Sequence, residues 1–185
     1  MSIVKRIINL MGGGIEVQSS KGKGTTFTVS LAVENVEGGA ADRSTTEELD
    51  YAALQGKRIL VCEDNKMNVE ILQVLLKSQG MLVETADNGQ QAVEKFAQSQ
   101  TGYYDAIIMD IRMPVMDGLE ATKAIRALDK VDAQAVPIIA NSADVFKEEV
   151  ERFLAAGMNN YVPKPIDKKR LYETLCEELG KRQSY

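Results

Sequence analysis

Residues 105–118 read DAIIMDIRMPVMDG, and this stretch decides the fold. A short apolar run, residues 106–109, leads into Asp110, after which Pro114 and Gly118 interrupt any regular element. An unbroken apolar run of this length between such breakers is typical of a strand buried on both faces of a parallel sheet. Asp110 is therefore expected at the carboxyl end of that strand, where open α/β sheets bind their ligands. A plainer alternative is an aspartate that caps a strand-to-helix turn.

A second apolar run, RILVC at residues 58–62, is also followed by acidic side chains, Glu63 and Asp64. If the two runs are neighbouring parallel strands, these carboxylates and Asp110 converge at one edge of the sheet. Three like charges repel one another and burial adds a desolvation cost, so such a cluster requires a cation. Oxygen ligands with room for water suit Mg²⁺ or Mn²⁺. A carboxylate beside such a metal can attack a phosphoryl group and form an acyl phosphate.

From residue 57 onward, strand patterns alternate with helical patterns, which indicates a parallel sheet with helices on both faces. Strands are expected near residues 58–62, 82–86, 105–109, 136–140 and 160–163. Helices are expected near residues 66–79, 88–99, 119–129, 144–156 and 167–179, and end at Gly80, Gly102, residues 129–134, Gly157 and Gly180. This order predicts an α/β flavodoxin-like (βα)5 fold, a doubly wound parallel sheet with strand order 2-1-3-4-5.

Four segments of this region resemble the receiver domain of two-component response regulators. They are ILVCEDN (59–65), MDIRMPVMDG (109–118), PIIANSA (137–143) and YVPKP (161–165). The resemblance runs from about Gly56 to Gly180, and residues 57–185 are identified as a receiver domain. It implies two-component phosphorelay signalling, in which the domain accepts a phosphoryl group from phosphohistidine with the help of Mg²⁺. It also implies slow self-dephosphorylation and a conformational switch.

The resemblance assigns the metal site and the reacting residue. Asp110 matches the phospho-acceptor of the family. Glu63 and Asp64 match the acidic pair that holds the metal, partly through water. Asp110 itself and the backbone carbonyl of Arg112 would complete the shell of ligands.

Three further residues match positions that respond to the phosphoryl group. Ser142 matches the hydroxyl residue that donates a hydrogen bond to a phosphoryl oxygen, although it could equally cap a helix that starts at residue 143. Lys164 matches the lysine that pairs with the phosphoryl oxygens, and its bond to Pro165 is cis in the family. Tyr161 matches the aromatic switch residue that turns inward, and the alternative is an ordinary half-buried strand aromatic.

Two positions depart from the usual pattern of the family. Ser142 occupies a position where threonine is commoner, which is a mild change because both side chains carry a hydroxyl group. Asn141 occupies a position where an apolar residue is usual, so the packing around it is expected to differ.

Residues 1–33 read as a helix followed by a β-hairpin. Apolar residues recur at helical spacing from Ile3 to Met11, and two alternating segments flank a turn at residues 21–24. The whole stretch resembles the last part of a histidine kinase ATP-binding domain, and the nucleotide-binding boxes of that domain would lie upstream. We therefore expect no ATP binding and no kinase activity here. The chain is expected to catalyse only its own phosphorylation and dephosphorylation.

Residues 34–56 carry Gly38-Gly39, a Ser-Thr-Thr run and six acidic side chains against a single arginine. This composition predicts a flexible, solvated linker between the kinase fragment and the receiver domain. Leu49, Tyr51 and Leu54 are candidates to dock onto the receiver.

The composition of the chain also limits which partners it is expected to bind. The formal net charge of −5 argues against a nucleic-acid backbone. The chain contains no histidine, so a phosphohistidine donor must belong to a histidine kinase or a histidine phosphotransfer protein.

Cys62 and Cys176 lie far apart in apolar patterns and are best explained as reduced thiols of a cytosolic protein. No apolar stretch has the length of a membrane span, so we expect a cytoplasmic chain without direct membrane contact, whose parent kinase can be membrane-anchored. Exposed apolar faces in residues 1–33 make a homodimer a further expectation.

Three other classes of protein share part of this pattern. A haloacid-dehalogenase-type phosphatase requires a second aspartate two residues after the first, and Arg112 occupies that position. A flavin-binding flavodoxin requires a Ser/Thr- and Gly-rich phosphate loop after the first strand, where Glu63 and Asp64 would repel a phosphate. A degenerate receiver that acts only as a protein-binding module stays open as the alternative, although its acceptor, acidic and lysine positions are all filled.

Overall fold

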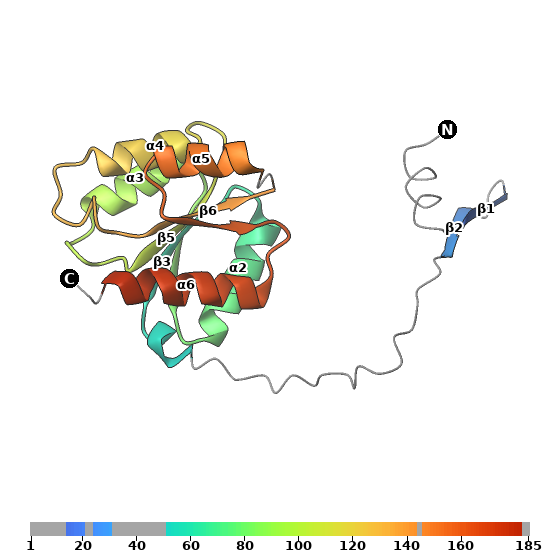
Figure 1. Ribbon diagram of the computed structural model, residues 1–185, viewed down its shortest axis with the longest axis horizontal. Coiled ribbons are helices and arrows are strands. Elements are labelled where there is room, and N and C mark those ends of the chain that lie inside the picture. The colour runs from blue at the N-terminus through green and yellow to red at the C-terminus, as the bar shows by residue number, and fades with distance from the viewer. Residues whose placement is uncertain (1–13, 21–23, 31–50, 144–145, 183–185) are drawn as a thin grey trace. The chain divides into compact units, whose positions relative to one another are not determined.

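The computed structural model describes residues 14–20, 24–30, 51–143 and 146–182 (Figure 1). The chain divides into two compact units, residues 1–47 and 48–185, and each is described by itself. In the first unit, β1 (Gly14–Ser20) and β2 (Gly24–Ser30) pair as an antiparallel hairpin, which confirms the expected strand pair. The helix expected from Ile3 to Met11 lies outside the described residues.

The second unit is built on one parallel sheet of five strands in the order β4-β3-β5-β6-β7. The strands are β3 (Arg58–Cys62), β4 (Leu82–Ala86), β5 (Ala106–Asp110), β6 (Ile138–Ser142) and β7 (Asn160–Pro163). Counted along the chain this is the order 2-1-3-4-5, so the predicted flavodoxin-like fold is confirmed. The central strands β5 and β6 are buried along their whole length, as their apolar runs predict.

Helices cover both faces of the sheet (Figure 1). On one face, α2 (Lys66–Ser78) and α6 (Lys168–Arg182) pack against a core that includes Ile59, Ile108, Leu72 and Leu175. On the other face, α3 (Gly89–Gln98), α4 (Gly118–Arg126) and α5 (Lys147–Ala155) cover a core that includes Leu60, Met109, Phe96, Ile125 and Phe153. Side chains along each strand alternate between the two cores, because successive residues of a strand point to opposite faces.

Two strands begin later than the sequence predicts. β5 starts at residue 106 and β6 at residue 138, one and two residues after the expected positions. Pro137 has no backbone N–H to donate, and the carbonyl of Val136 accepts a hydrogen bond from the side chain of Arg126 instead of a neighbouring strand. Pairing between β5 and β6 therefore begins at Ile107 and Ile138.

Three helices differ from their expected bounds by more than one residue. α4 ends at Arg126 instead of residue 129, where the side chain of Gln134 caps the Arg126 carbonyl. α5 begins at Lys147 instead of residue 144. α6 continues through Gly180, which was expected to end it, because Lys181 forms ion pairs with two acidic residues in the preceding turn, at 2.8 Å each.

A short 3-10 helix, η1 (Tyr51–Leu54), lies against α6. Leu54 is fully buried in the core between α2 and α6, and the ring centroid of Tyr51 lies 5.0 Å from that of Tyr172 in an edge-to-face arrangement. The expected docking of Tyr51 and Leu54 is confirmed, whereas Leu49 lies outside the described residues.

Candidate functional site

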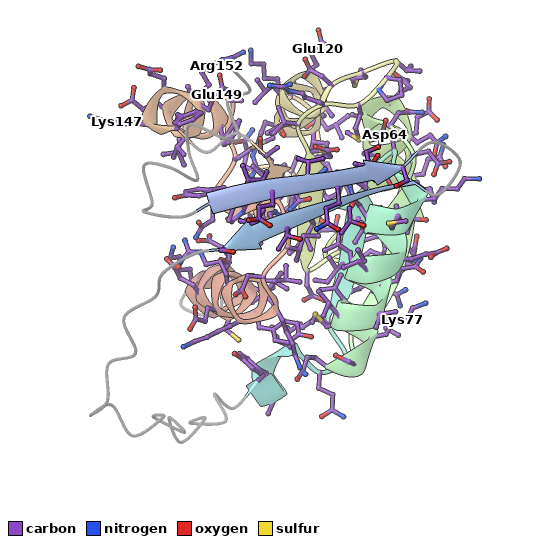
Figure 2. The ribbon with its side chains drawn as sticks, turned by 90° about the vertical axis from the view of Figure 1, so that its right-hand side faces the viewer. Asp64, Lys77, Glu120, Lys147, Glu149 and Arg152 are labelled. Atoms are coloured by element: carbon purple, nitrogen blue, oxygen red, sulfur yellow. The ribbon has the colours of Figure 1, made fainter. Side chains whose placement is uncertain are left out.

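Acidic side chains meet where β3 and β5 end. Glu63 follows β3, and Asp110 is the last residue of β5, the neighbouring strand. One carboxylate oxygen from each of Glu63, Asp64 and Asp110 lies within 4.8 Å of the other two. The structure thus brings together the three carboxylates that the sequence placed at one edge of the sheet. Figure 2 shows Asp64 at the end of the domain where α2 begins, opposite Lys77 near the end of that helix.

The three carboxylates differ in exposure. Only 1% of the Glu63 surface and 6% of the Asp110 surface is exposed, whereas Asp64 is open to solvent. Burial raises the pKa of the Asp110 carboxyl, and the charge of Glu63 raises it further, while the hydrogen bond from Lys164 acts in the opposite direction. Keeping Asp110 ionised therefore costs free energy in this site, and a nearby positive charge reduces that cost.

Lys164 supplies that positive charge from the segment after β7. Its Nζ atom lies 2.7 Å from Oε2 of Glu63 and 2.8 Å from Oδ2 of Asp110. Burial alone would lower the pKa of Lys164, but its hydrogen bonds to Asp110 and Glu63 outweigh burial and raise that pKa. The Lys164–Pro165 peptide bond is cis. The Lys164 backbone N–H donates a 2.8 Å hydrogen bond to the carbonyl of Ser142, which ties the end of β7 to the end of β6.

Ser142 is the last residue of β6 and is buried. It does not cap the next helix, so that alternative is wrong. α5 begins at Lys147, and its N-cap residue is Phe146, whose side chain makes no capping hydrogen bond. β6 also ends two residues later than expected, and its pairing with β7 extends to Ser142 and Pro163. The hydroxyl group is thereby held on the sheet instead of on a helix.

Asn141 lies next to Asp110 in the register between β5 and β6. Its side chain is 1% exposed, and Nδ2 donates a 3.2 Å hydrogen bond to the carbonyl of Val162. Among the described residues, Oδ1 of Asn141 is a buried oxygen without a hydrogen-bond partner. A buried polar atom therefore occupies the position where the family usually has an apolar one.

The loop after Asp110 fixes the Asp110 carboxylate through a backbone hydrogen bond. The backbone N–H of Arg112 donates to Oδ1 of Asp110 at 3.3 Å, and the N–H of Gly118 donates to the carbonyl of Ile111 at 3.0 Å. A Cβ atom at Gly118 would collide with the backbone oxygen of Asp110, so only glycine fits this close approach. The structure thus explains the glycine of the MDG segment, while a role for the Arg112 carbonyl as a metal ligand stays a prediction.

Tyr161 lies on β7 and is half-buried. It packs against the core beneath α3, α4 and α5, and the Arg170 guanidinium lies 5.9 Å from its ring centroid. Both the switch interpretation and the plain interpretation of Tyr161 predict this half-buried position. Its role as a switch stays a prediction.

Two residues of the site were not expected from the sequence. Asn65 caps α2 by accepting hydrogen bonds from the backbone N–H groups of Met67 and Asn68. Asn68 in turn donates a hydrogen bond from Nδ2 to Oε1 of Glu63 at 2.9 Å. The available signal was the N-x-x-N spacing directly after the two acidic residues, in the first turn of the expected helix.

The donor set fits a hard divalent cation. Three carboxylates against one ammonium leave an excess of negative charge, and carboxylate oxygens are the ligands that Mg²⁺ and Mn²⁺ prefer. The exposed side of Asp64 leaves room for the water ligands that Mg²⁺ usually retains. Asp110 is also a carboxylate whose two oxygens are fixed by different donors, as a nucleophile in an in-line displacement requires.

Within the described residues, no helix is both long enough and apolar enough to cross a membrane.

Comparison with known proteins supports the same interpretation. A family model described as the response regulator receiver domain matches residues 59–176. The chain is 38% identical over 136 residues to hybrid signal transduction histidine kinase I of Dictyostelium discoideum, covering 72% of this chain and 8% of that protein. It is 35% identical over 175 residues to the autoinducer 2 sensor kinase/phosphatase LuxQ of Vibrio vulnificus, covering 95% of this chain and 20% of that protein. The chain therefore spans a small fraction of the length of these relatives.

Solved structures agree with the fold. The receiver domain of the sensor histidine kinase PA1611 from Pseudomonas aeruginosa is 39% identical, with a TM-score of 0.61, and the match covers 68% of this chain and 98% of that one. That crystal structure has a magnesium ion coordinated in its active site cleft. The chemotaxis protein CheY4 of Vibrio cholerae is 28% identical, with a TM-score of 0.60, and the match covers 66% of this chain and 98% of that one.

Proposed function

The chain belongs to the response regulator receiver domain family, and on that premise we propose that Asp110 accepts a phosphoryl group from a phosphohistidine in a two-component phosphorelay. The observation that carries this proposal is the contact of Lys164 with both Glu63 and Asp110, in a cluster that also contains Asp64. This arrangement combines a nucleophilic carboxylate, a fixed cation for phosphoryl oxygens and a set of ligands for a divalent metal. Each of the three is needed to transfer a phosphoryl group to a carboxylate.

The reaction proceeds by in-line displacement at phosphorus. An oxygen of Asp110 forms the new P–O bond as the P–N bond to the donor imidazole breaks, and the imidazole leaves with that electron pair and takes up a proton. Lys164 then pairs with a phosphoryl oxygen, and the Ser142 hydroxyl donates to another. Glu63, Asp64 and Asp110, with the Arg112 carbonyl, would hold Mg²⁺ or Mn²⁺, which neutralises the charge that develops on the phosphoryl oxygens. Water later hydrolyses the acyl phosphate, which restores the Asp110 carboxylate and releases phosphate.

The switch follows from the same contacts. A phosphoryl group on Asp110 adds negative charge, so Lys164 and Ser142 are drawn toward it. Ser142 ends β6 and Tyr161 lies on the paired strand β7, with Ala140 as its neighbour in the register. A shift of the Ser142 segment therefore opens space into which Tyr161 turns, and the surface formed by α5, β7 and α6 changes.

The partner that carries the phosphohistidine is a histidine kinase or a histidine phosphotransfer protein. An apolar stripe on α2 supports docking beside the site: Met67, Ile71 and Val74 are 70%, 44% and 69% exposed and follow helical spacing. Exposed apolar residues that form a continuous stripe mark interaction surfaces. A homodimer through exposed apolar residues of the 1–33 segment, such as Val17 and Val29, is also proposed. Nucleic acid and membrane are not proposed as partners.

Residues 1–33 are proposed to be the end of a histidine kinase ATP-binding domain, followed by a linker at 34–56 and the receiver domain at 57–185. The β1–β2 hairpin supports this because Val17 and Val29 are 54% and 49% exposed, and an isolated two-stranded hairpin is at best marginally stable. Such a hairpin needs the rest of a domain to cover it. The chain is thus proposed to belong to a hybrid histidine kinase and to bind no ATP by itself. It is proposed to act in the cytoplasm, beside a membrane-anchored kinase core.

The proposal is tested by intact mass spectrometry after incubation with Mg²⁺ and phosphoramidate or acetyl phosphate. The parent chain is expected to gain one phosphoryl group, and the Asp110→Asn variant none. Beryllofluoride binding, measured in parallel, reports on the site without covalent chemistry. If the parent gains no phosphoryl group and binds no beryllofluoride, Asp110 is not an acceptor and a receiver-like binding module is the better description.

A further inference from the structure

The two oxygens of Glu63 are held by different parts of the fold. Oε2 accepts the hydrogen bond from Lys164 Nζ at 2.7 Å, on the side of Asp110. Oε1 accepts from Asn68 Nδ2 at 2.9 Å and from the backbone N–H of Asn65 at 3.3 Å, on the side of α2. The Glu63 carboxylate is almost fully buried, so these contacts fix its orientation.

The start of α2 places Asn68 for this contact. Asn65 caps the helix through its side-chain oxygen, which fixes the first turn relative to the end of β3. Asn68 lies in that first turn, five positions after Glu63, and its amide points back toward the carboxylate. An amide N–H is a donor that carries no charge, so Asn68 orients Glu63 without competing with a cation for it.

We propose that Asn68 is a positioning residue that sets the affinity of the acidic cluster for Mg²⁺ by holding Glu63 in its ligating orientation. A glutamate has three rotatable side-chain bonds, and a metal ligand that is free to rotate must lose that freedom when the ion binds. Hydrogen bonds to a charged acceptor are roughly twice as strong as those between neutral groups, so the Asn68 amide restrains Glu63 effectively. Residues that orient metal ligands typically change metal affinity by about 10-fold or more when they are replaced.

The part of this inference that concerns phosphorylation rests on the proposed function, because Mg²⁺ there assists transfer to Asp110. The part that concerns Mg²⁺ binding does not. Asn68 is not a catalytic residue, since nothing places it at the reacting atoms. Its removal should therefore raise the Mg²⁺ concentration needed for half-maximal phosphorylation, while the rate at saturating Mg²⁺ is preserved.

The test compares the parent chain with Asn68→Leu, which has the same branched shape, no donor and a higher helix propensity. Gln73→Leu is the matched control, because Gln73 lies five residues further along α2 and, among the described contacts, none of its hydrogen bonds reaches the cluster. Titration calorimetry with Mg²⁺ alone gives the dissociation constant of each folded protein, and a urea melt confirms folding. Asn68→Ala serves as a second variant if leucine disturbs the helix.

We expect the dissociation constant for Mg²⁺ to rise about 10-fold in Asn68→Leu and to stay unchanged in Gln73→Leu. With phosphoramidate, the half-saturating Mg²⁺ concentration should rise by about the same factor, and the rate at saturation should stay within about threefold of the parent. An unchanged Mg²⁺ dissociation constant in both Asn68 variants overturns the inference and leaves the proposed function intact. A parent that binds Mg²⁺ tightly but takes up no phosphoryl group removes the proposed function and leaves the role of Asn68 in metal affinity standing. A parent that binds no Mg²⁺ overturns both.

Discussion

Lys164 Nζ lies 2.8 Å from Oδ2 of Asp110, although the two residues are 54 positions apart in the chain. The contact joins the last strand of the sheet to its central strand, and Glu63 completes it from the other side at 2.7 Å. Both carboxylates are buried, so the single ammonium group of Lys164 neutralises much of the negative charge of the site.

Replacing Lys164 with methionine should slow phosphoryl uptake from phosphoramidate by about 100-fold, because a preorganised donor to the phosphoryl oxygens is lost. The rate is measured by intact mass against time at saturating Mg²⁺. Lys147→Met, on α5 and far more exposed, is the matched control and should react like the parent (Figure 2). Equal rates for the parent and Lys164→Met would show that the lysine has no part in the transfer.

Asp110→Asn should make the folded domain more stable at pH 7, because burial and the charge of Glu63 disfavour the ionised carboxylate that the amide replaces. The pKa of Asp110 is raised in the folded state, so the native protein holds this proton more tightly than the unfolded chain. Stability contributed by the aspartate therefore falls as pH rises from its unfolded value of about 3.9 through the higher folded value. Urea melts at several pH values, without divalent ions, should show the variant gaining on the parent across that window. A gain that appears below the window instead would contradict the assigned shift.

Ser142→Ala should reduce the phosphorylation rate about tenfold, whereas Ser142→Thr should keep it, because the hydroxyl group donates to a charged phosphoryl oxygen. The measurement is the same time course of intact mass. Ser99→Ala removes a hydroxyl from the end of α3 and is expected to leave the rate unchanged. If alanine and threonine at position 142 behave alike, the hydroxyl group is not the functional part of this residue.

Asn141→Leu should stabilise the domain by about 1 kcal/mol, because a buried oxygen without a partner is replaced by an apolar side chain of the same branched shape. The free energy of unfolding from urea melts is the readout. Asn160→Leu on the neighbouring strand is the contrasting variant, since the Asn160 amide donates to Glu178 at 3.1 Å and its loss should destabilise the domain. A loss of stability in Asn141→Leu would mean that the hydrogen bond to Val162 outweighs the unsatisfied oxygen.

Leu54→Ala should destabilise the domain by about 3 kcal/mol, the usual cost of a large-to-small change in a core. Its side chain is fully buried between α2 and α6, although it lies before the first strand of the sheet. The same urea melts measure the effect, and Ala53→Gly in the exposed part of η1 reports the cost of a change in the short helix alone. A small effect of Leu54→Ala would show that η1 is detached in solution.

The sequence predicts the sheet and the acidic cluster because both depend on patterns along single strands. An apolar run that ends in Asp110 and another that ends in Glu63 suffice to place two strand ends, and parallel pairing brings them together. The start of β6 could not be placed in this way, because residues 136–140 are apolar throughout and only the lack of an N–H at Pro137 delays pairing.

Contacts between individual side chains could not be predicted from the sequence, for a different reason. The start of α2 at residue 66 was predicted, but the hydrogen bond between Asn68 and Glu63 depends on the rotamers of both side chains, which no pattern along the chain gives. The continuation of α6 through Gly180 depends on ion pairs of Lys181, which offset the low helix propensity of glycine.

The position of η1 also determines where this domain can be cut and joined. A receiver grafted onto another kinase at Lys57, the residue before the first strand, would arrive without Leu54 and would leave the ring of Tyr172 without its Tyr51 neighbour. A junction placed before Tyr51 transfers η1 together with the core between α2 and α6 into which Leu54 packs. For anyone who rewires signalling proteins from such modules, the unit to exchange therefore begins at Tyr51, so that η1 stays with the sheet, and the choice of junction will affect the stability of a chimaera before its signalling can be assayed.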